Sequence, residues 1–367
     1  ARLAAPRGAC QALAAAALLG RAASRRRQRQ PGRGLAARAA AAEPLSGAEV
    51  ADEDVNLARL YLLLTAACWA TYPVLVKILV QTSGTVLDAS LLTVIRFTMN
   101  AVIGAFLIPP GLLPWSRGAP GAAAAVDAAA LARASAEISA VGIAGTLLNT
   151  WGIEHTSAIR AALLLSSINV ITPFLSVLIG SSPEDRNVSP QTWLSCGVSF
   201  AATAYATLGG EGSAAARGLQ LGDLAVLGAA CCYAAVKVRL AARARTFQAE
   251  ALAAGRLLAG AVLSWLVFAA GNALGEEANW QEQVAQLPAA AWGLLLLSSL
   301  VPGVLATVLQ SKGQRTVPPA QAQTIYAAVP LFAAAYDLAF LQEAIEDREV
   351  VAGVAIVAGA VLASRED

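Results

Sequence analysis

Charged side chains are scarce in this sequence of 367 residues: Asp, Glu, Lys and Arg make up 14 %, whereas hydrophobic residues make up 57 %. A soluble domain carries about 25 % charged residues, so the composition argues against an ordinary soluble fold. Histidine occurs once, at His155, which leaves little material for a Ser-His-Asp triad. The sequence also has no phosphate-binding glycine loop and no His/Cys metal cluster. We therefore expect no enzyme, no cofactor and no metal site.

Cysteine is also infrequent, and its positions do not indicate disulfides. Four of the five cysteines fall inside predicted apolar helices, without the paired spacing of a zinc site. We expect them to be small buried packing residues. The five are Cys10, Cys68, Cys196, Cys231 and Cys232.

Acidic residues are absent from residues 1–42, which hold nine of the 26 basic residues, all of them Arg. A basic, Ala-rich, acid-free segment is typical of an organellar transit peptide, so residues 1–45 are predicted to be a presequence. A plastid is the first expectation, a mitochondrion the second, and a disordered basic tail the alternative. Without residues 1–42 the chain has 17 basic and 24 acidic residues. Nothing in its body indicates a nucleic-acid surface.

Long apolar stretches are what the sequence contains instead. A bilayer-spanning helix needs about 20 mostly apolar residues, and a hydropathy pass gives ten candidates separated by turns rich in Pro, Gly or charge. We therefore expect an all-α membrane protein with ten transmembrane helices. The candidates cover residues 57–80, 88–109, 133–152, 159–180, 192–209, 220–240, 248–270, 290–311, 321–341 and 349–364.

The first five spans resemble the second five. Short matches occur in each pair of equivalent helices, at offsets between 156 and 163 residues, so their order and spacing are preserved. We predict two five-helix repeats, at residues 57–210 and 218–365. The matches are Ala66-Ala67-Cys68 with Ala229-Ala230-Cys231, Arg96-Phe97 with Arg256-Leu257, Gly152 with Gly313, Pro173 with Pro330, and Gly197-Val198 with Gly353-Val354.

The odd number of helices in each repeat implies that the second copy enters the membrane upside down. This inverted arrangement is typical of secondary transporters, whose substrate site lies near the midplane between the halves. Basic residues in the predicted loops favour the side that holds both termini, by nine to four, which predicts that this side is equivalent to the cytosol. The nine are Arg117, Arg133, Arg186, Lys237, Arg239, Arg243, Arg245, Lys312 and Arg315; the four are Lys77, Arg160, Arg217 and Arg348.

Several short motifs resemble the drug/metabolite transporter superfamily, in particular its EamA-type branch. The resemblance spans roughly residues 57 to 365 and implies ten helices and transport of a small metabolite. It rests on Ala67-Cys68-Trp69-Ala70-Thr71-Tyr72-Pro73 followed by Lys77, on Leu92-Thr93-Val94-Ile95-Arg96-Phe97, on Trp151-Gly152-Ile153-Glu154-His155-Thr156-Ser157-Ala158, on Val317-Pro318-Pro319-Ala320-Gln321-Ala322, and on Pro330 followed 13 residues later by Glu343.

Two arginines lie well inside predicted helices and are candidates for the substrate pathway. Arg96 and Arg256 stand about 10–12 Å from the nearer helix end at 1.5 Å per residue, where a charge costs at least about 2.5–3.5 kcal/mol on insertion scales. Each needs a partner or a wet cavity. They form either a paired cationic site for an anionic substrate or structural ties to helix ends and carbonyl groups. Asn100 lies one turn after Arg96 and shares its face.

Polar residues also line one face of each of the helices predicted at 159–180 and 321–341. In lipid such a face turns inward, either to line a cavity or to form hydrogen bonds between helices. The stripes are Ser166, Asn169, Pro173 and Ser176 in the first helix, and Gln323, Tyr326, Pro330 and Asp337 in the second. Asp337 either titrates during transport or forms a static ion pair. Further candidates for the pathway are Trp69, Tyr72, Asn149 and Gln310.

These observations favour a secondary transporter of a small metabolite that works by alternating access. The alternatives are an antiporter of anionic or phosphorylated solutes, as in sister branches of the superfamily, and a membrane scaffold that transports nothing. The expected partners are the lipid bilayer and a small substrate, which is anionic or resembles an amino acid. The expected location is a plastid envelope, with a mitochondrial or other cell membrane as the alternative. A homodimer is compatible with all of these.

Overall fold

The computed structural model describes residues 55–83, 87–107, 128–156, 158–208, 220–273, 280–342 and 347–364, which are helical apart from short turns. Two compact units are distinguished, and the larger one, Asp54–Phe268 with Asn279–Asp367, holds nearly all of these helices. The smaller unit is Ala1–Glu53 with Ala269–Ala278, of which only the last turn of one helix is described. The predicted presequence and Glu343 lie outside the described residues.

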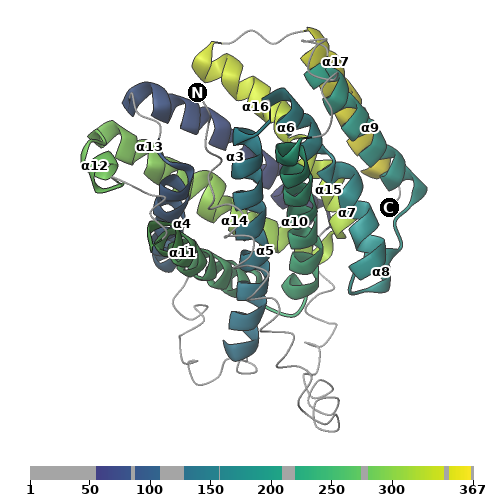
Figure 1. Ribbon diagram of the computed structural model, residues 1–367. Coiled ribbons are helices and arrows are strands. Elements are labelled where there is room, and N and C mark those ends of the chain that lie inside the picture. The colour runs from purple at the N-terminus through teal and green to yellow at the C-terminus, as the bar shows by residue number, and fades with distance from the viewer. Residues whose placement is uncertain are drawn as a thin grey trace. The chain divides into compact units, whose positions relative to one another are not determined.

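Among the residues that the structure describes, the predicted first repeat contains seven helices, which Figure 1 labels. The fourth predicted span is divided between two of them, and a short helix follows it. In chain order they are α3 (Val55–Ser83), α4 (Ala89–Leu107), α5 (Ala128–Glu154), α6 (Ala158–Ser166), α7 (Ile168–Ile179), α8 (Pro183–Arg186) and α9 (Pro190–Leu208).

The predicted second repeat is more interrupted, because π-helical turns appear in two of its spans. It contains α10 (Leu221–Ala244), α11 (Ala249–Ala273), α12 (Trp280–Ala285), α13 (Ala289–Ser299), the π-helical η3 (Leu300–Leu305), α14 (Ala306–Thr316), α15 (Pro319–Tyr326), α16 (Val329–Tyr336), the π-helical η4 (Asp337–Leu341) and α17 (Asp347–Ser364).

Seven helical stretches of the described chain are long and apolar enough to cross a membrane. The helices at residues 90–106 and 350–361 are apolar but shorter, and α9 has 19 residues without being among the seven. The sequence prediction of an all-α protein with many spans is confirmed.

The fourth and ninth predicted spans are broken at equivalent positions. Ser167 separates α6 from α7 with φ −58° and ψ −16°, and Ala327 ends α15 with the same two angles. The two residues are 160 positions apart, which falls within the offsets of the repeat. Such interrupted helices near a repeat interface are characteristic of transporter binding sites.

Each repeat packs its first helix into the other repeat. Helix α3 packs against α13, α14, α15 and α16, whereas α10 packs against α5, α6 and α7. The partners of α10 are therefore the first-repeat equivalents of the partners of α3. Helices α9 and α17, which end the two repeats, lie side by side (Figure 1). This exchange is what a two-fold relation between inverted repeats requires.

Two glycines allow these exchanged helices to approach closely. A Cβ atom added at Gly152 would lie 2.6 Å from Val226 Cγ2 and 3.0 Å from the Gly222 carbonyl oxygen. One added at Gly313 would lie 2.5 Å from Leu62 Cδ2 and 2.9 Å from the carbonyl oxygen of Ala58. Ala58 and Leu62 precede Gly222 and Val226 by the same 164 residues, so the two contacts are equivalent.

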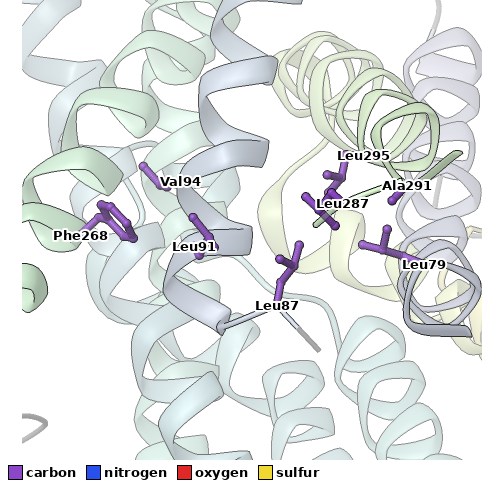
Figure 2. Packing of buried hydrophobic residues seen from close by; sticks show 8 residues of the cluster. All are labelled: Leu79, Leu87, Leu91, Val94, Phe268, Leu287, Ala291 and Leu295. Atoms are coloured by element: carbon purple, nitrogen blue, oxygen red, sulfur yellow. The ribbon is translucent and has the colours of Figure 1, made fainter. Parts of the chain in front are cut away.

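The largest apolar cluster joins both repeats at one end of the larger unit. Figure 2 shows its side chains, which come from α3, α4, α11 and α13 and from the turns before α4 and α13. Because these helices come from both repeats, the cluster buries the interface between them. Its members are Leu79, Leu87, Leu91, Val94, Phe268, Leu287, Ala291 and Leu295.

One detail of the loop assignment was wrong. The sixth span was predicted to end at residue 240, with Lys237 counted among the loop residues. Helix α10 continues to Ala244 and Lys237 is only 7 % exposed. The helix extends because Ala241, Ala242 and Ala244 are strong helix formers, so Lys237 belongs to the helix interior.

Candidate functional site

A chain of buried polar side chains joins three helices from both repeats. Lys237 of α10 donates from Nζ to Gln323 Oε1 of α15 at 2.5 Å. The Gln323 amide nitrogen donates to Asn169 Oδ1 of α7 at 2.6 Å. All three residues are buried, with exposed fractions of 7 %, 2 % and 6 %. Asn169 and Gln323 lie within four residues of the two helix breaks, which brings α7 and α15 together here.

Among the residues that the structure describes, Lys237 has no acidic partner. Its amino group contacts the Gln323 oxygen and stands 5.3 Å from the centre of the Tyr326 ring, and within the described residues no carboxylate lies in ion-pair range. A buried ammonium group that is balanced by amide and ring contacts alone is costly. Such an arrangement in a membrane helix makes Lys237 a candidate for a functional site.

Arg256 of α11 provides a second cation next to the same tyrosine. Its guanidinium donates to Gln310 Oε1 at 3.1 Å and to Ser311 Oγ at 3.3 Å, both on α14, and it interacts electrostatically with Tyr326. Tyr326 in turn packs on the Trp69 ring with centroids 4.9 Å apart. Its hydroxyl is buried beside the Gln310 side chain.

Lys237 and Arg256 lie at the same depth. Lys237 precedes the end of α10 by seven residues, and Arg256 follows the start of α11 by seven, which is about 10 Å in each case. A short turn joins these two helix ends, so both cations are equally far from the same side of the fold. By the parity of the helices this is the side of the termini. We call Lys237, Arg256, Gln310, Gln323, Tyr326, Trp69 and Asn169 the central polar cluster.

Arg96 belongs to a different group, nearer the opposite side. Its guanidinium carbon lies 4.0 Å from the centre of the Tyr72 ring, and Nη2 donates to the carbonyl oxygen of Ser298 at 3.4 Å. That carbonyl ordinarily accepts from the N–H of residue 302, which is Pro302 and has none. The π-helical segment η3 follows here, as is common where the helix ladder is disturbed.

Asn100 supports the same irregular segment. With its amide oriented to suit its neighbours, the nitrogen donates to the carbonyl oxygens of Ser299 and Arg96, both at 3.1 Å. In the described chain no hydrogen bond or ion pair links the central polar cluster to Arg96, Asn100 or Tyr72. The two predicted arginines are therefore not brought into one site.

The backbones of the two arginines are nevertheless held in the same way. The Ser139 hydroxyl donates to the Arg256 carbonyl oxygen at 3.0 Å, and the Ser299 hydroxyl donates to the Arg96 carbonyl oxygen at 3.5 Å. Ser299 follows Ser139 by 160 residues, and Arg256 follows Arg96 by the same number, so the two contacts are equivalent. The repeats thus match at the backbone and differ in what the guanidinium groups contact.

The remaining candidates are not members of the central polar cluster. Asp337 is half-buried at the start of η4. Asn149 lies in α5 with its side-chain oxygen buried and without a hydrogen-bond partner. In the stripe of the ninth span, Pro330 is exposed whereas Gln323 and Tyr326 are buried, because the break at Ala327 and Ala328 rotates the second half. The prediction that these residues form one continuous face is therefore wrong.

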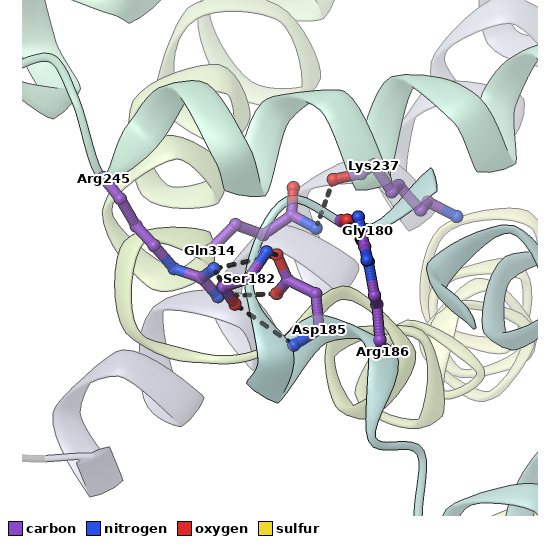
Figure 3. Close-up of polar contacts among 7 residues, drawn as sticks. All are labelled: Gly180, Ser182, Asp185, Arg186, Lys237, Arg245 and Gln314. Atoms are coloured by element: carbon purple, nitrogen blue, oxygen red, sulfur yellow. Dashed lines mark hydrogen bonds and ion pairs between the residues drawn. The ribbon is translucent and has the colours of Figure 1, made fainter. Parts of the chain in front are cut away.

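Buried ion pairs hold both ends of α10 against the first repeat. At one end, Asp223 accepts from Thr156 Oγ1 at 2.6 Å and pairs with Arg160 of α6. At the other end, Arg245 binds both oxygens of Asp185, at 2.7 and 2.8 Å. Figure 3 shows this second pair, with the Lys237 carbonyl accepting from Gln314 and the Lys237 amino group directed away from the pair.

Sequence reasoning missed Lys237 as a site residue. The signal was present, since Lys237 lies within the predicted span 220–240. It was counted with the loop because the end of that span was placed four residues before the end of α10 at Ala244. The helix boundary decided the interpretation, and boundaries are the least certain part of a hydropathy pass.

The comparisons with known proteins bear directly on this arrangement. The EamA-like transporter family model matches twice, at residues 56–208 and 220–365. No curated protein matches the chain. A solved crystal structure, described only as that of a protein, is similar with a TM-score of 0.64 and 19 % identity, and the match covers 84 % of this chain and 96 % of that one. At this identity the likeness shows the fold alone.

The two matches to one family model together cover most of the chain. They coincide with the two sets of helices in which α3 and α10 each pack against the other set. The function of that family is membrane transport rather than enzymatic catalysis. This chain belongs to the EamA-like transporter family and is a multi-pass integral membrane protein.

Proposed function

We propose that this protein is a secondary transporter that moves a small metabolite by alternating access around the central polar cluster. The observation that carries the proposal is the buried Lys237–Gln323–Asn169 chain of hydrogen bonds. A membrane protein without a solute pathway gains little from burying an ammonium group among amides, since each buried polar group costs free energy unless it is fully paired.

The broken helices support the same proposal. Asn169 and Gln323 meet where α7 and α15 lie next to their interruptions, and the two repeats exchange their first helices around this point. A site held between inverted halves is exposed to one side or the other when the halves tilt. The ion pairs at the two ends of α10, Arg160–Asp223 and Arg245–Asp185, lie on opposite sides of it.

A membrane scaffold is the competing function from another class. A scaffold requires apolar helix packing of the kind seen in the cluster around Leu91 and Leu295. It does not require a buried cation without a carboxylate, and Lys237 therefore favours transport.

Two finer expectations belong to this proposal. Residues 1–45, which contain nine Arg and no acidic residue before position 43, favour a plastid envelope as the host membrane. Imaging of a fluorescent fusion with and without this segment tests the expectation. The repeat limits 57–210 and 218–365 and the homodimer stay predictions.

Reconstitution tests the transport function. Purified protein in liposomes is offered labelled amino acids, carboxylates, sugar phosphates and neutral sugars, with protein-free liposomes as the control. We expect saturable uptake of at least one solute and exchange of preloaded solute against the same compound outside. Absence of both for every solute, from protein that is folded by thermal unfolding, contradicts the proposal and favours the scaffold.

A further inference from the structure

We propose that Lys237 and Arg256 bind the anionic group of the transported solute, so that the substrate is a small metabolite carrying a carboxylate or phosphate. This inference rests on the proposed transport function and names its substrate class. Sequence reasoning had placed the paired cationic site at Arg96 and Arg256. The structure assigns Arg96 to the Pro302 irregularity instead, and it brings Lys237 to the same tyrosine as Arg256.

The first argument is the distribution of carboxylates. The two fully buried aspartates of the described chain, Asp185 and Asp223, are each paired with an arginine at an end of α10. The two cations of the central polar cluster have no carboxylate in range in the part of the chain that the structure describes. The protein therefore neutralises buried charge at the ends of α10 and leaves positive charge in its interior.

The second argument is the nature of the groups that the cations contact. The amide oxygen of Gln323 lies 2.5 Å from Lys237 Nζ, and that of Gln310 lies 3.1 Å from Arg256 Nη2. Both are neutral acceptors within hydrogen-bond reach of a cation, so they stand where a carboxylate or phosphate oxygen could accept from the same donors. A solute oxyanion is a stronger partner for each cation than an amide, so it displaces the amide oxygens when it binds.

The third argument is the orientation of Gln323. Its nitrogen donates to Asn169 Oδ1 at 2.6 Å, which directs its oxygen towards Lys237. The amide is thereby fixed as an acceptor for the ammonium group while the solute is absent. When the solute replaces it, the link between α15 and α7 loosens, and this link joins the two repeats at their breaks.

The fourth argument is Tyr326, which interacts with both cations. Its ring centre is 5.3 Å from Lys237 Nζ, its ring packs on Trp69, and it interacts electrostatically with Arg256. Tyr326 is 3 % exposed, and its buried hydroxyl lies beside the Gln310 side chain. This hydroxyl is a donor near two cations, which suits an acceptor-rich solute group.

The binding experiment uses purified full-length protein in detergent and measures its melting temperature with saturating succinate, glycerol 3-phosphate, glucose or choline. Succinate and glycerol 3-phosphate separate the two sources of the anionic group. We expect at least one of them to raise the melting temperature by about 3 °C or more, and glucose and choline to have no effect. Stabilisation by glucose or choline alone overturns the inference.

Variants locate the effect. Lys237→Gln and Arg256→Gln are expected to lose the stabilisation by anions. Lys312→Gln is the matched control, because Lys312 is a basic residue of α14 whose amino group is paired with a carboxylate, that of Glu250. Anion stabilisation that persists in both cluster variants, or that is lost equally in the control, overturns the assignment.

Gln323→Glu keeps the test decisive if the neutral variants fail to fold. The new carboxylate lies beside Lys237 and takes the position of the solute anion. We expect this variant to melt at or above the wild-type temperature and to bind no anion. A Gln323→Glu protein that binds anions as the wild type does overturns the inference.

The two proposals fail in distinguishable ways. Anion binding that depends on Lys237, in protein that moves no solute through liposomes, supports the anion site and contradicts the transport function. Saturable uptake of a neutral or cationic solute, without any effect of anions on melting, supports transport and contradicts the anion site.

Discussion

Arg96 donates a hydrogen bond to the carbonyl oxygen of Ser298 across the contact between α4 and α13, at 3.4 Å. This carbonyl is the one that Pro302 leaves without its usual partner in the helix. In a membrane, an unpaired carbonyl costs several kcal/mol because no water replaces the lost partner. The Arg96 guanidinium therefore stabilises the irregular π-helical segment η3 in the eighth span.

The link between Arg96 and Pro302 is open to a double-mutant cycle. Arg96→Met is expected to destabilise the protein by about 1.5–3 kcal/mol, the range for hydrogen bonds from charged groups. In a Pro302→Ala background, the introduced alanine supplies the missing N–H, so the same change is expected to cost at least about 1 kcal/mol less. Unfolding titrations in mixed detergent micelles measure both. Equal losses in the two backgrounds contradict the assigned role.

The close approaches at Gly152 and Gly313 predict matched effects in the two repeats. Gly152→Ala and Gly313→Ala are each expected to cost about 1–3 kcal/mol, because the added methyl group overpacks the contacts with Val226 and Leu62. Gly293→Ala in α13 is the control, since nothing lies within 4 Å of its added Cβ, and it is expected to be neutral or stabilising by up to about 1 kcal/mol. A control as damaging as the other two refutes the packing argument.

The ion pair between Asp185 and Arg245 predicts a large loss on removal of one partner. Asp185 is fully buried and holds both guanidinium contacts, so Asp185→Asn is expected to destabilise the fold by about 3 kcal/mol. Glu137→Gln is the comparison. Glu137 pairs with Arg239 and Arg243, but all three are partly exposed, and the expected loss is below about 1 kcal/mol. Similar losses for the two variants would argue against the buried pair as a clamp.

Asp337 tests whether transport is coupled to protons. It is half-buried at the start of η4, where an acid is expensive unless it is paired or protonated. If it titrates during the cycle, Asp337→Asn removes the pH dependence of uptake into liposomes while the protein still folds. Uptake by the variant with an unchanged pH profile shows a static role and ends the proton-coupling hypothesis.

The repeat and the helix positions could be predicted from sequence because they depend on apolar length and on regularly spaced matches. Arg96 with Arg256 and Gly152 with Gly313 indicated the duplication, and the equivalent contacts of Ser139 and Ser299 now show it at the backbone. The exchange of α3 and α10 between the repeats was not predictable, since hydropathy says how long a helix is and nothing about its neighbours.

The candidate site was predictable only in part, for a physical reason. Polar residues at helical spacing identified Asn169, Gln323 and Tyr326, and the structure joins the first two directly. Lys237 was missed because a basic residue near a helix end is typical both of a loop and of a buried site. What each arginine contacts depends on Pro302 and on the π-helical turns, which arise from packing and leave no periodic pattern in the sequence.

The most direct test of the account is the uptake of a labelled anion by proteoliposomes that contain equal amounts of wild-type, Lys237→Gln or Lys312→Gln protein. The account predicts that Lys237→Gln lowers the initial rate at least about tenfold, which is about 1.4 kcal/mol, and that Lys312→Gln leaves it within about twofold of the wild type. Equal anion uptake by the wild type and Lys237→Gln would contradict the account.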